Sequence, residues 1–106
     1  MSSKKPIYEL RIYTIIPKYY PDLLKLWEKD GKIIISKYMN CIGIWSSEFG
    51  ELNKIFHLYK WNNHSERNES RSKFYKDPSA KKYVKKVKNF YQKQESYMLS
   101  SLDKLF

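Results

Sequence analysis

His57 is the side chain best suited to acid–base chemistry in this chain, because an imidazole titrates near neutral pH. It lies in residues 55–61, a run of β-branched and aromatic residues that is typical of a strand. Alternation along that strand places Ile55, His57, Tyr59 and Trp61 on one face. Since both faces are largely apolar, we expect this strand in the middle of a sheet, where burial would control the charge of the imidazole.

Glu48 is the candidate partner of His57. It lies in the preceding predicted strand, residues 42–49, and the turn residues Gly50 and Asn53 predict a hairpin between the two strands. If the register allows it, Glu48 would orient His57 as a general acid or base. The alternative is a hydrogen-bonded structural histidine, because a buried imidazole needs partners whether or not it reacts.

Arg11, Arg67 and Arg71 are the only arginines in a lysine-rich chain, which suggests a need for guanidinium geometry opposite a carboxylate. One role that fits is an internal salt-bridge network, and the other is anion binding at the mouth of a cavity. The candidate partners within the chain are Glu9, Glu48 and Glu66.

Aromatic side chains form a third group of candidate site residues. They would line a pocket for a flat aromatic ligand if they face a cavity, and would otherwise belong to the core. The members of this group are Tyr13, Trp27, Trp45, Tyr59 and Trp61.

These residues are positioned by a predicted order of elements, βαββαβ. The expected strands cover residues 7–16, 42–49, 55–61 and 95–99, and the expected helices cover 21–37, 66–75 and 79–92. That order is typical of an α+β ferredoxin-like fold, in which both helical segments lie on one face of an antiparallel sheet. The other face would be apolar and would need a cover, which predicts a homodimer.

Length and composition limit the remaining possibilities. The 106 residues fit one domain, 7–106, after a short disordered basic tail, 1–6. The formal charge of +10 is almost entirely lysine, which favours solvated faces over specific nucleic-acid binding. A lone Cys41 and the absence of a long apolar run predict a cytoplasmic protein without membrane insertion, and no metal or cofactor motif is visible.

Several uncommon elements, in their order and spacing, resemble the NIPSNAP family over most of the chain. The matching residues are Tyr8-Glu9-Leu10-Arg11, Tyr13, Leu26-Trp27, Gly43, Trp45, Glu48, Gly50, Leu52-Asn53, His57-Leu58, Arg67, Arg71, Asp77-Pro78, Tyr83 and Gln94-Glu95-Ser96.

The resemblance implies a dimeric α+β barrel, in which two ferredoxin-like sheets pack face to face. Eukaryotic members of the family are linked to mitochondria and mitophagy signalling. Short bacterial members share their fold with monooxygenases, haem-degrading enzymes and other small-molecule enzymes. Because no mitochondrial presequence is visible, the short bacterial-type form is expected here.

The leading hypothesis is a cofactor-independent enzyme or binding protein for an aromatic or carboxylate-bearing small molecule, with an acid–base role in a biosynthetic pathway if it is an enzyme. One alternative is a non-catalytic adaptor dimer, and another is a basic module that binds nucleic acid or anionic lipid. The expected catalytic residues are His57 and Glu48, and the expected substrate-binding residues are Arg11, Tyr13, Trp45, Tyr59, Trp61, Arg67 and Arg71.

Overall fold

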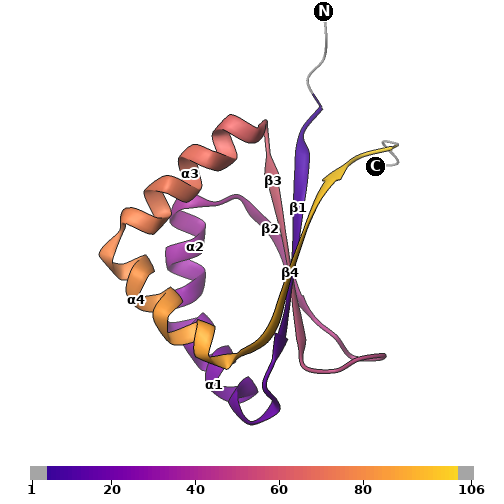
Figure 1. Cartoon of the computed structure of the whole chain (residues 1–106), viewed down its shortest axis with the longest axis vertical. Helices are drawn as coiled ribbons and strands as arrows, with labels where there is room; N and C mark the ends of the chain where they lie inside the picture. Colours follow the sequence, from indigo (N-terminus) through magenta and orange to yellow (C-terminus); the bar gives the residue numbers. More distant parts are fainter. Residues whose placement is uncertain (1–4, 103–106) are drawn as a thin grey trace, which may run out of the picture.

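The computed structural model describes residues 5–102 and contains a four-stranded antiparallel sheet in the order β2–β3–β1–β4. All helices cover the same face of this sheet, and the opposite face is open (Figure 1). The predicted ferredoxin-like α+β fold is therefore confirmed. The strands are β1 (Ile7–Ile15), β2 (Cys41–Ser46), β3 (Lys54–Trp61) and β4 (Tyr91–Ser100).

The first helical segment replaces the single helix predicted for residues 21–37. A 3-10 turn, Pro17–Tyr19, leads into α1 (Tyr20–Leu26), and a π-helical turn, Trp27–Gly31, joins α1 to α2 (Lys32–Tyr38). Proline suits the start of the segment because the first turn of a helix needs no N–H donor there. The π-helical turn is an irregularity that the apolar spacing did not reveal.

The second helical segment consists of α3 (His64–Lys76) and α4 (Pro78–Val87). The Asn63 side chain caps α3 by accepting a hydrogen bond from the backbone N–H of Glu66 at 2.8 Å. Asp77 caps α4 in the same way, through the N–H of Ser79 at 2.8 Å. The Asp77-Pro78 pair thus ends one helix and begins the next, as the sequence predicts.

The predictions for β2 and β4 were wrong at their ends. β2 stops at Ser46 rather than residue 49, because the chain turns away into a loop in which Gly50 and Asn53 both have positive φ, of 78° and 63°. β4 begins at Tyr91, four residues before the predicted start, and pairs with β1 along almost its whole length. Pairing with β1 therefore decides the conformation of residues that a continued helical pattern would also fit.

Two hydrophobic clusters fill the space between the sheet and the helices. The first is built around Tyr13, Ile55 and Tyr83, and the second around Trp61 and Phe74. Strand alternation on β1 and β3 supplies the sheet side of both clusters, and on β3 the buried residues are those predicted to share one face. No helix described between residues 5 and 102 is long and apolar enough to cross a membrane. Residues 1–4 of the predicted tail lie outside the described range.

The open face of the sheet carries the alternate residues of the same strands. Trp45 is 53% exposed and Tyr97 is 49% exposed, which is unusual for large aromatic side chains on a sheet. Strand register places a largely apolar surface here, made of Tyr8, Leu10, Ile12, Trp45, Phe56, Leu58, Tyr97 and Leu99. The same face also carries Lys54, Lys60, Lys93 and Glu95. Such a face favours the predicted homodimer.

We expect sedimentation at micromolar concentration to give about twice the 12.9 kDa monomer mass. Leu58→Glu should convert the dimer to a monomer, because it places a charge in the centre of the open face. Ile33→Glu is the matched control, since Ile33 is 67% exposed on α2, on the helical side. A wild-type chain that sediments as a monomer would contradict the barrel arrangement.

Candidate functional site

His57 lies at the centre of the helix-covered face of the sheet. Its cross-strand neighbours are Arg11 on β1 and Ile44 on β2. The side chain is 8% exposed, and the predicted face of β3 is buried at each of its alternate positions from Ile55 to Trp61. The predicted strand, and the position of Ile55, His57, Tyr59 and Trp61 on one face of it, are confirmed.

A cavity of about 190 Å³ lies between this face and α1, and we refer to it as the aromatic cavity. None of its lining residues is Asp, Glu, Lys or Arg. His57, Tyr13 and Ile55 form its floor on the sheet, and Trp27 and Tyr83 line it from the helical segments. An apolar cavity of about 150 Å³ can hold a benzene-sized ligand, so this space suits a single ring.

The imidazole of His57 is surrounded by aromatic groups. Its Nδ1 lies 2.8 Å from the hydroxyl oxygen of Tyr59. The Tyr13 and Trp27 rings meet it edge-on, with ring centroids at 5.0 and 5.3 Å. Burial, followed by the nearby charge of Arg11, lowers the pKa of His57 to about 4.

His57 is therefore a neutral imidazole at physiological pH. At pH 7, roughly one molecule in a thousand would carry it protonated. It cannot serve as a general acid in that state, but it can accept a proton or a hydrogen bond. The burial of the Tyr13 and Tyr59 hydroxyl groups raises their pKa values, so both phenols are neutral beside it.

The π-helical turn Trp27–Gly31 gives the helical wall of the aromatic cavity its shape. Gly31 is packed so closely that an added Cβ would lie 2.5 Å from the Tyr83 hydroxyl oxygen and 2.7 Å from Cε3 of Trp27. Both of those side chains line the cavity. Single π-helical turns inside helices occur frequently at functional sites. Gly31 and the π-helical turn were not predicted from the sequence.

A buried carboxylate, Glu9, organises the polar side of the site. Its side chain is 1% exposed and accepts hydrogen bonds from three residues. Arg67 binds it with Nε at 2.9 Å and Nη2 at 3.0 Å, Arg11 with Nη1 at 3.0 Å, and Trp61 with Nε1 at 3.2 Å. We call these four residues the Glu9 network. The predicted internal salt-bridge role is confirmed for Arg11 and Arg67.

The charge balance of the Glu9 network favours an ionised carboxylate. Burial alone would raise the pKa of Glu9, but the hydrogen bonds and charges of Arg67 and Arg11 outweigh burial and lower this pKa to about 2. Arg11 also donates Nε to the Tyr13 hydroxyl oxygen at 2.7 Å. The network therefore holds Tyr13 from one end while the Tyr13 ring lines the aromatic cavity.

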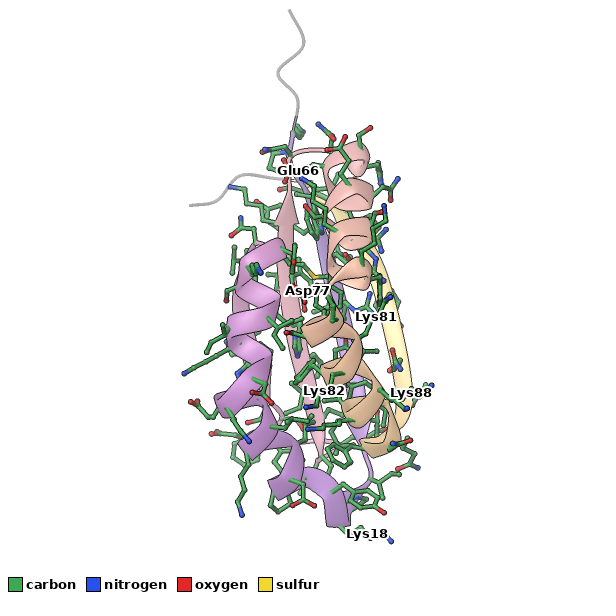
Figure 2. The ribbon with its side chains drawn as sticks, turned by 90° about the vertical axis from the view of Figure 1, so that its left-hand side faces the viewer. Lys18, Glu66, Asp77, Lys81, Lys82 and Lys88 are labelled. Carbon is green, nitrogen blue, oxygen red and sulfur yellow. The ribbon has the colours of Figure 1, made fainter. Side chains whose placement is uncertain are left out.

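A second hollow, of about 80 Å³, lies beside the aromatic cavity and toward β4. Arg11, Arg71 and Lys88 contribute to its lining, which includes no Asp or Glu, and we call it the cationic hollow. It shares Tyr13 and His57, together with Tyr83 and Tyr91, with the aromatic cavity. Lys88 lies next to β4 at the end of α4 (Figure 2).

Glu48 does not reach His57 in this structure. It is exposed in the loop that follows β2, and no ion pair or hydrogen bond to it occurs among the described residues. The residue opposite His57 on β2 is Ile44, four positions earlier, and each strand residue spans about 3.3 Å. The expected Glu48 partnership was wrong, and the partner of the imidazole is Tyr59.

The other predicted site residues fall into three groups. Tyr13 lines the aromatic cavity, and Arg11, Tyr59 and Arg71 line the cationic hollow, which Tyr13 also borders. Trp45 borders the aromatic cavity only on the edge strand β2, where the register pairs it with Phe56 on the open face. Trp61 and Arg67 line neither space, because their N–H groups bind Glu9. Sequence reasoning placed Tyr83 and Tyr91 in the apolar stripe of one helix and did not identify them as site residues.

The described residues contain no group of three or more His, Cys, Asp or Glu side chains that could hold a metal ion. His57 is surrounded by phenol and indole groups rather than by further ligands. The chemistry available to these residues is therefore hydrogen bonding, proton acceptance and the binding of rings and anions.

The fold and site define a class of protein: a single ferredoxin-like α+β domain with an aromatic cavity between its sheet and one layer of helices. Within this class, the family model described as NIPSNAP matches residues 8–103. The chain therefore belongs to the NIPSNAP family, as the resemblance in the sequence implied.

Known relatives agree with this assignment. Protein NipSnap homolog 3A of Homo sapiens is 34% identical over 71 residues, which cover 66% of this chain and only 28% of the human protein. The chain thus matches well under a third of the length of that relative.

Solved structures extend the match to the fold. An uncharacterized NIPSNAP domain protein from Burkholderia xenovorans is 26% identical, with a TM-score of 0.85 and coverage of 90% of this chain and 93% of that one. A NIPSNAP family protein from Agrobacterium tumefaciens is 24% identical, with a TM-score of 0.90 and coverage of 97% and 91%. Two bacterial structures without the family name, 5% and 14% identical, share the fold alone, with TM-scores of 0.70 and 0.66.

The lowered pKa of His57 predicts a specific dependence of stability on pH. The ordinary value is 6.5 and the folded value is about 4, so between these values the unfolded chain binds the proton more tightly than the folded chain. The free energy of unfolding should therefore decrease as the pH falls below about 6.5, by about 2 kcal/mol at pH 5. Urea unfolding at pH 7 and pH 5 measures this difference.

His57→Gln should remove this pH dependence, because Gln does not titrate. The exposed His64 provides the control, since His64→Gln should retain the full decrease. Both pH values lie above the ordinary 4.5 of Glu9, so the Glu9 network stays ionised throughout. An equal loss of stability in wild type and His57→Gln would show that His57 is not the group responsible.

Gly31→Ala should deform the aromatic cavity, because the new Cβ would collide with Tyr83 and Trp27. We expect a destabilisation on the order of 1–3 kcal/mol from overpacking and a change in Trp fluorescence. Gly50→Ala is the comparison: no atom lies within 4 Å of its added Cβ, so any loss there comes from its φ of +78° and should leave the Trp signal unchanged. Unaltered stability and fluorescence in Gly31→Ala would contradict this account of the π-helical turn.

Proposed function

We propose that this NIPSNAP protein is a small-molecule enzyme or binding protein that takes an aromatic or carboxylate-bearing ligand in the aromatic cavity, without a cofactor. The observation that carries the proposal is the uncharged cavity of about 190 Å³ that has a neutral, buried His57 on its floor. Cavities of this kind, with few convergent polar groups, are the usual form of a ligand site.

The arrangement of polar groups favours recognition of a ring that carries one polar substituent. Rings would contact the faces and edges of Tyr13, Trp27 and Tyr83, which line the cavity. In the tautomer in which Nδ1–H of His57 donates to the Tyr59 hydroxyl oxygen, Nε2 is left to accept a hydrogen bond or a proton from the ligand. If the ligand is converted, His57 is the candidate base, because its neutral form is already present at pH 7.

A screen of single-ring aromatic compounds, monitored by thermal stabilisation and by 1H–15N NMR shifts, tests the proposal. Ligands should raise the melting temperature and shift the resonances of Tyr13 and Trp27, since ligands that bind only the folded state stabilise it. Leu24→Trp should abolish binding, because Leu24 is 43% exposed and belongs to the cavity lining.

The matched control is Ile33→Trp, which adds an indole to the same helical segment at an exposed position outside the cavity. It should bind ligands as the wild type does. The proposal fails if no aromatic compound shifts cavity resonances, or if Leu24→Trp and Ile33→Trp bind equally well.

A further inference from the structure

The cationic hollow has a charge that the rest of the site does not neutralise. Arg11, Arg71 and Lys88 lie in its lining without an acidic residue. The single carboxylate nearby, Glu9, already accepts bonds from both Arg11 and Arg67. Among the described residues, Arg71 forms no ion pair, and its one hydrogen bond goes to a neutral group.

Arg71 is held in place but keeps donors available. Its Nη2 donates to the Tyr75 hydroxyl oxygen at 3.0 Å, and its guanidinium lies over the Tyr75 ring with Cζ 5.2 Å from the centroid. Arg11 uses Nε on Tyr13 and Nη1 on Glu9, and its Nη2 makes no hydrogen bond to a described residue. Two oriented guanidinium groups with unused N–H donors suit a planar carboxylate.

The cationic hollow lies directly beside the aromatic cavity. Four aromatic residues, Tyr13, His57, Tyr83 and Tyr91, contribute to both spaces. Tyr13 joins them most directly, because its hydroxyl oxygen lies 2.7 Å from Arg11 Nε while its ring borders the aromatic cavity. The two spaces therefore adjoin at these four shared side chains, and a single ligand that occupies both must pass between them.

The sizes of the two spaces suit two different parts of one molecule. The cationic hollow, at about 80 Å³, has room for a carboxylate with little else, since each water in the liquid occupies about 30 Å³. The aromatic cavity, at about 190 Å³, has room for one ring but has no charged residue to pair with an acid.

We infer that the ligand is an aryl carboxylate, with its ring in the aromatic cavity and its carboxylate in the cationic hollow between Arg11 and Arg71. This inference rests on the proposed function and makes it specific, because it requires both chemical features in one molecule. Gln94, on β4 opposite Tyr13, supplies a further amide donor at the same hollow. Lys88 adds positive charge at the side of the hollow next to β4 (Figure 2).

The test compares three acids with their own amides: benzoate, phenylacetate and 3-phenylpropionate against benzamide, phenylacetamide and 3-phenylpropionamide. Each pair has the same ring and spacer, so the difference isolates the carboxylate. In titrations followed by 1H–15N NMR on the full chain, the best of the acids should bind about tenfold tighter than its amide or better, as expected for charge-assisted hydrogen bonds.

Variants assign that preference to the cationic hollow. Arg71→Gln should weaken the binding of the acids much more than that of the amides, and so remove most of the difference between acid and amide. Arg71→Lys should retain part of the difference, because it keeps the charge but loses the guanidinium fork. Lys82→Gln is the control for net charge: Lys82 is exposed on α4 and absent from the hollow lining, so the preference should persist. A thermal melt confirms that each variant is folded.

The outcomes separate this inference from the proposed function. If amides and acids bind the aromatic cavity equally, the inference is overturned and the proposed function stands. If acids bind but Leu24→Trp does not weaken them, the ring does not occupy the cavity, and the joined site is likewise overturned. Acetate and inorganic phosphate serve as ring-free anions, and either one binding as tightly as the best aryl acid shows an anion site unconnected to the cavity. Failure of every acid in the millimolar range overturns the inference outright.

Discussion

The burial of the Glu9 carboxylate is the interaction on which the site depends. An ionised carboxylate with 1% exposure is strongly unfavourable unless its charge and lone pairs are satisfied. Both oxygens of Glu9 accept two hydrogen bonds each, from residues on β1, β3 and α3. The network therefore fixes the position of α3 over the sheet as well as the orientation of Arg11.

The Glu9 carboxylate affects the candidate site through its neighbours on β1. Alternation places Glu9, Arg11 and Tyr13 on one face, so the carboxylate positions Arg11, and Arg11 in turn holds the Tyr13 hydroxyl. The same guanidinium lies opposite His57 on β3 and contributes, after burial, to keeping the imidazole neutral. Through Arg11, the buried Glu9 carboxylate thus positions the Tyr13 hydroxyl and influences the charge state of His57.

Strand alternation made much of this arrangement predictable from the sequence. Residues of one strand face have a fixed period, so the residues that share a face with His57 on β3 followed from the sequence, whereas the face of β1 that the helices cover did not. The scarcity of arginine pointed to an ion-pair role with Glu9, Glu48 or Glu66 as partner, because an unusual residue in a lysine-rich chain suggests a geometric need. The structure selects Glu9 for Arg11 and Arg67. Asp77-Pro78 likewise predicted a boundary between two helices, because Asp caps a helix through a local hydrogen bond and proline suits its first turn.

The features that the sequence did not predict depend on contacts between segments that lie far apart in the chain. The Glu48 prediction required a hairpin register, and the loop with positive φ at Gly50 and Asn53 removes Glu48 from the sheet. The early start of β4 depends on pairing with β1, and the π-helical turn depends on the fit of Gly31 against Tyr83. Tyr83 and Tyr91 carry no local signal that distinguishes a cavity wall from a helical core.

Side chains of β3 alternate between the two faces of the sheet, so this strand contributes to two separate surfaces. His57 and Tyr59 face the helices, while Phe56 and Leu58 face the open side of the sheet. A substitution on the open face therefore leaves the floor of the aromatic cavity unchanged, and a substitution on that floor leaves the open face intact. The surface that favours association and the floor of the candidate site are thus carried by alternate residues of one strand, so each can be altered separately in the experiments described above.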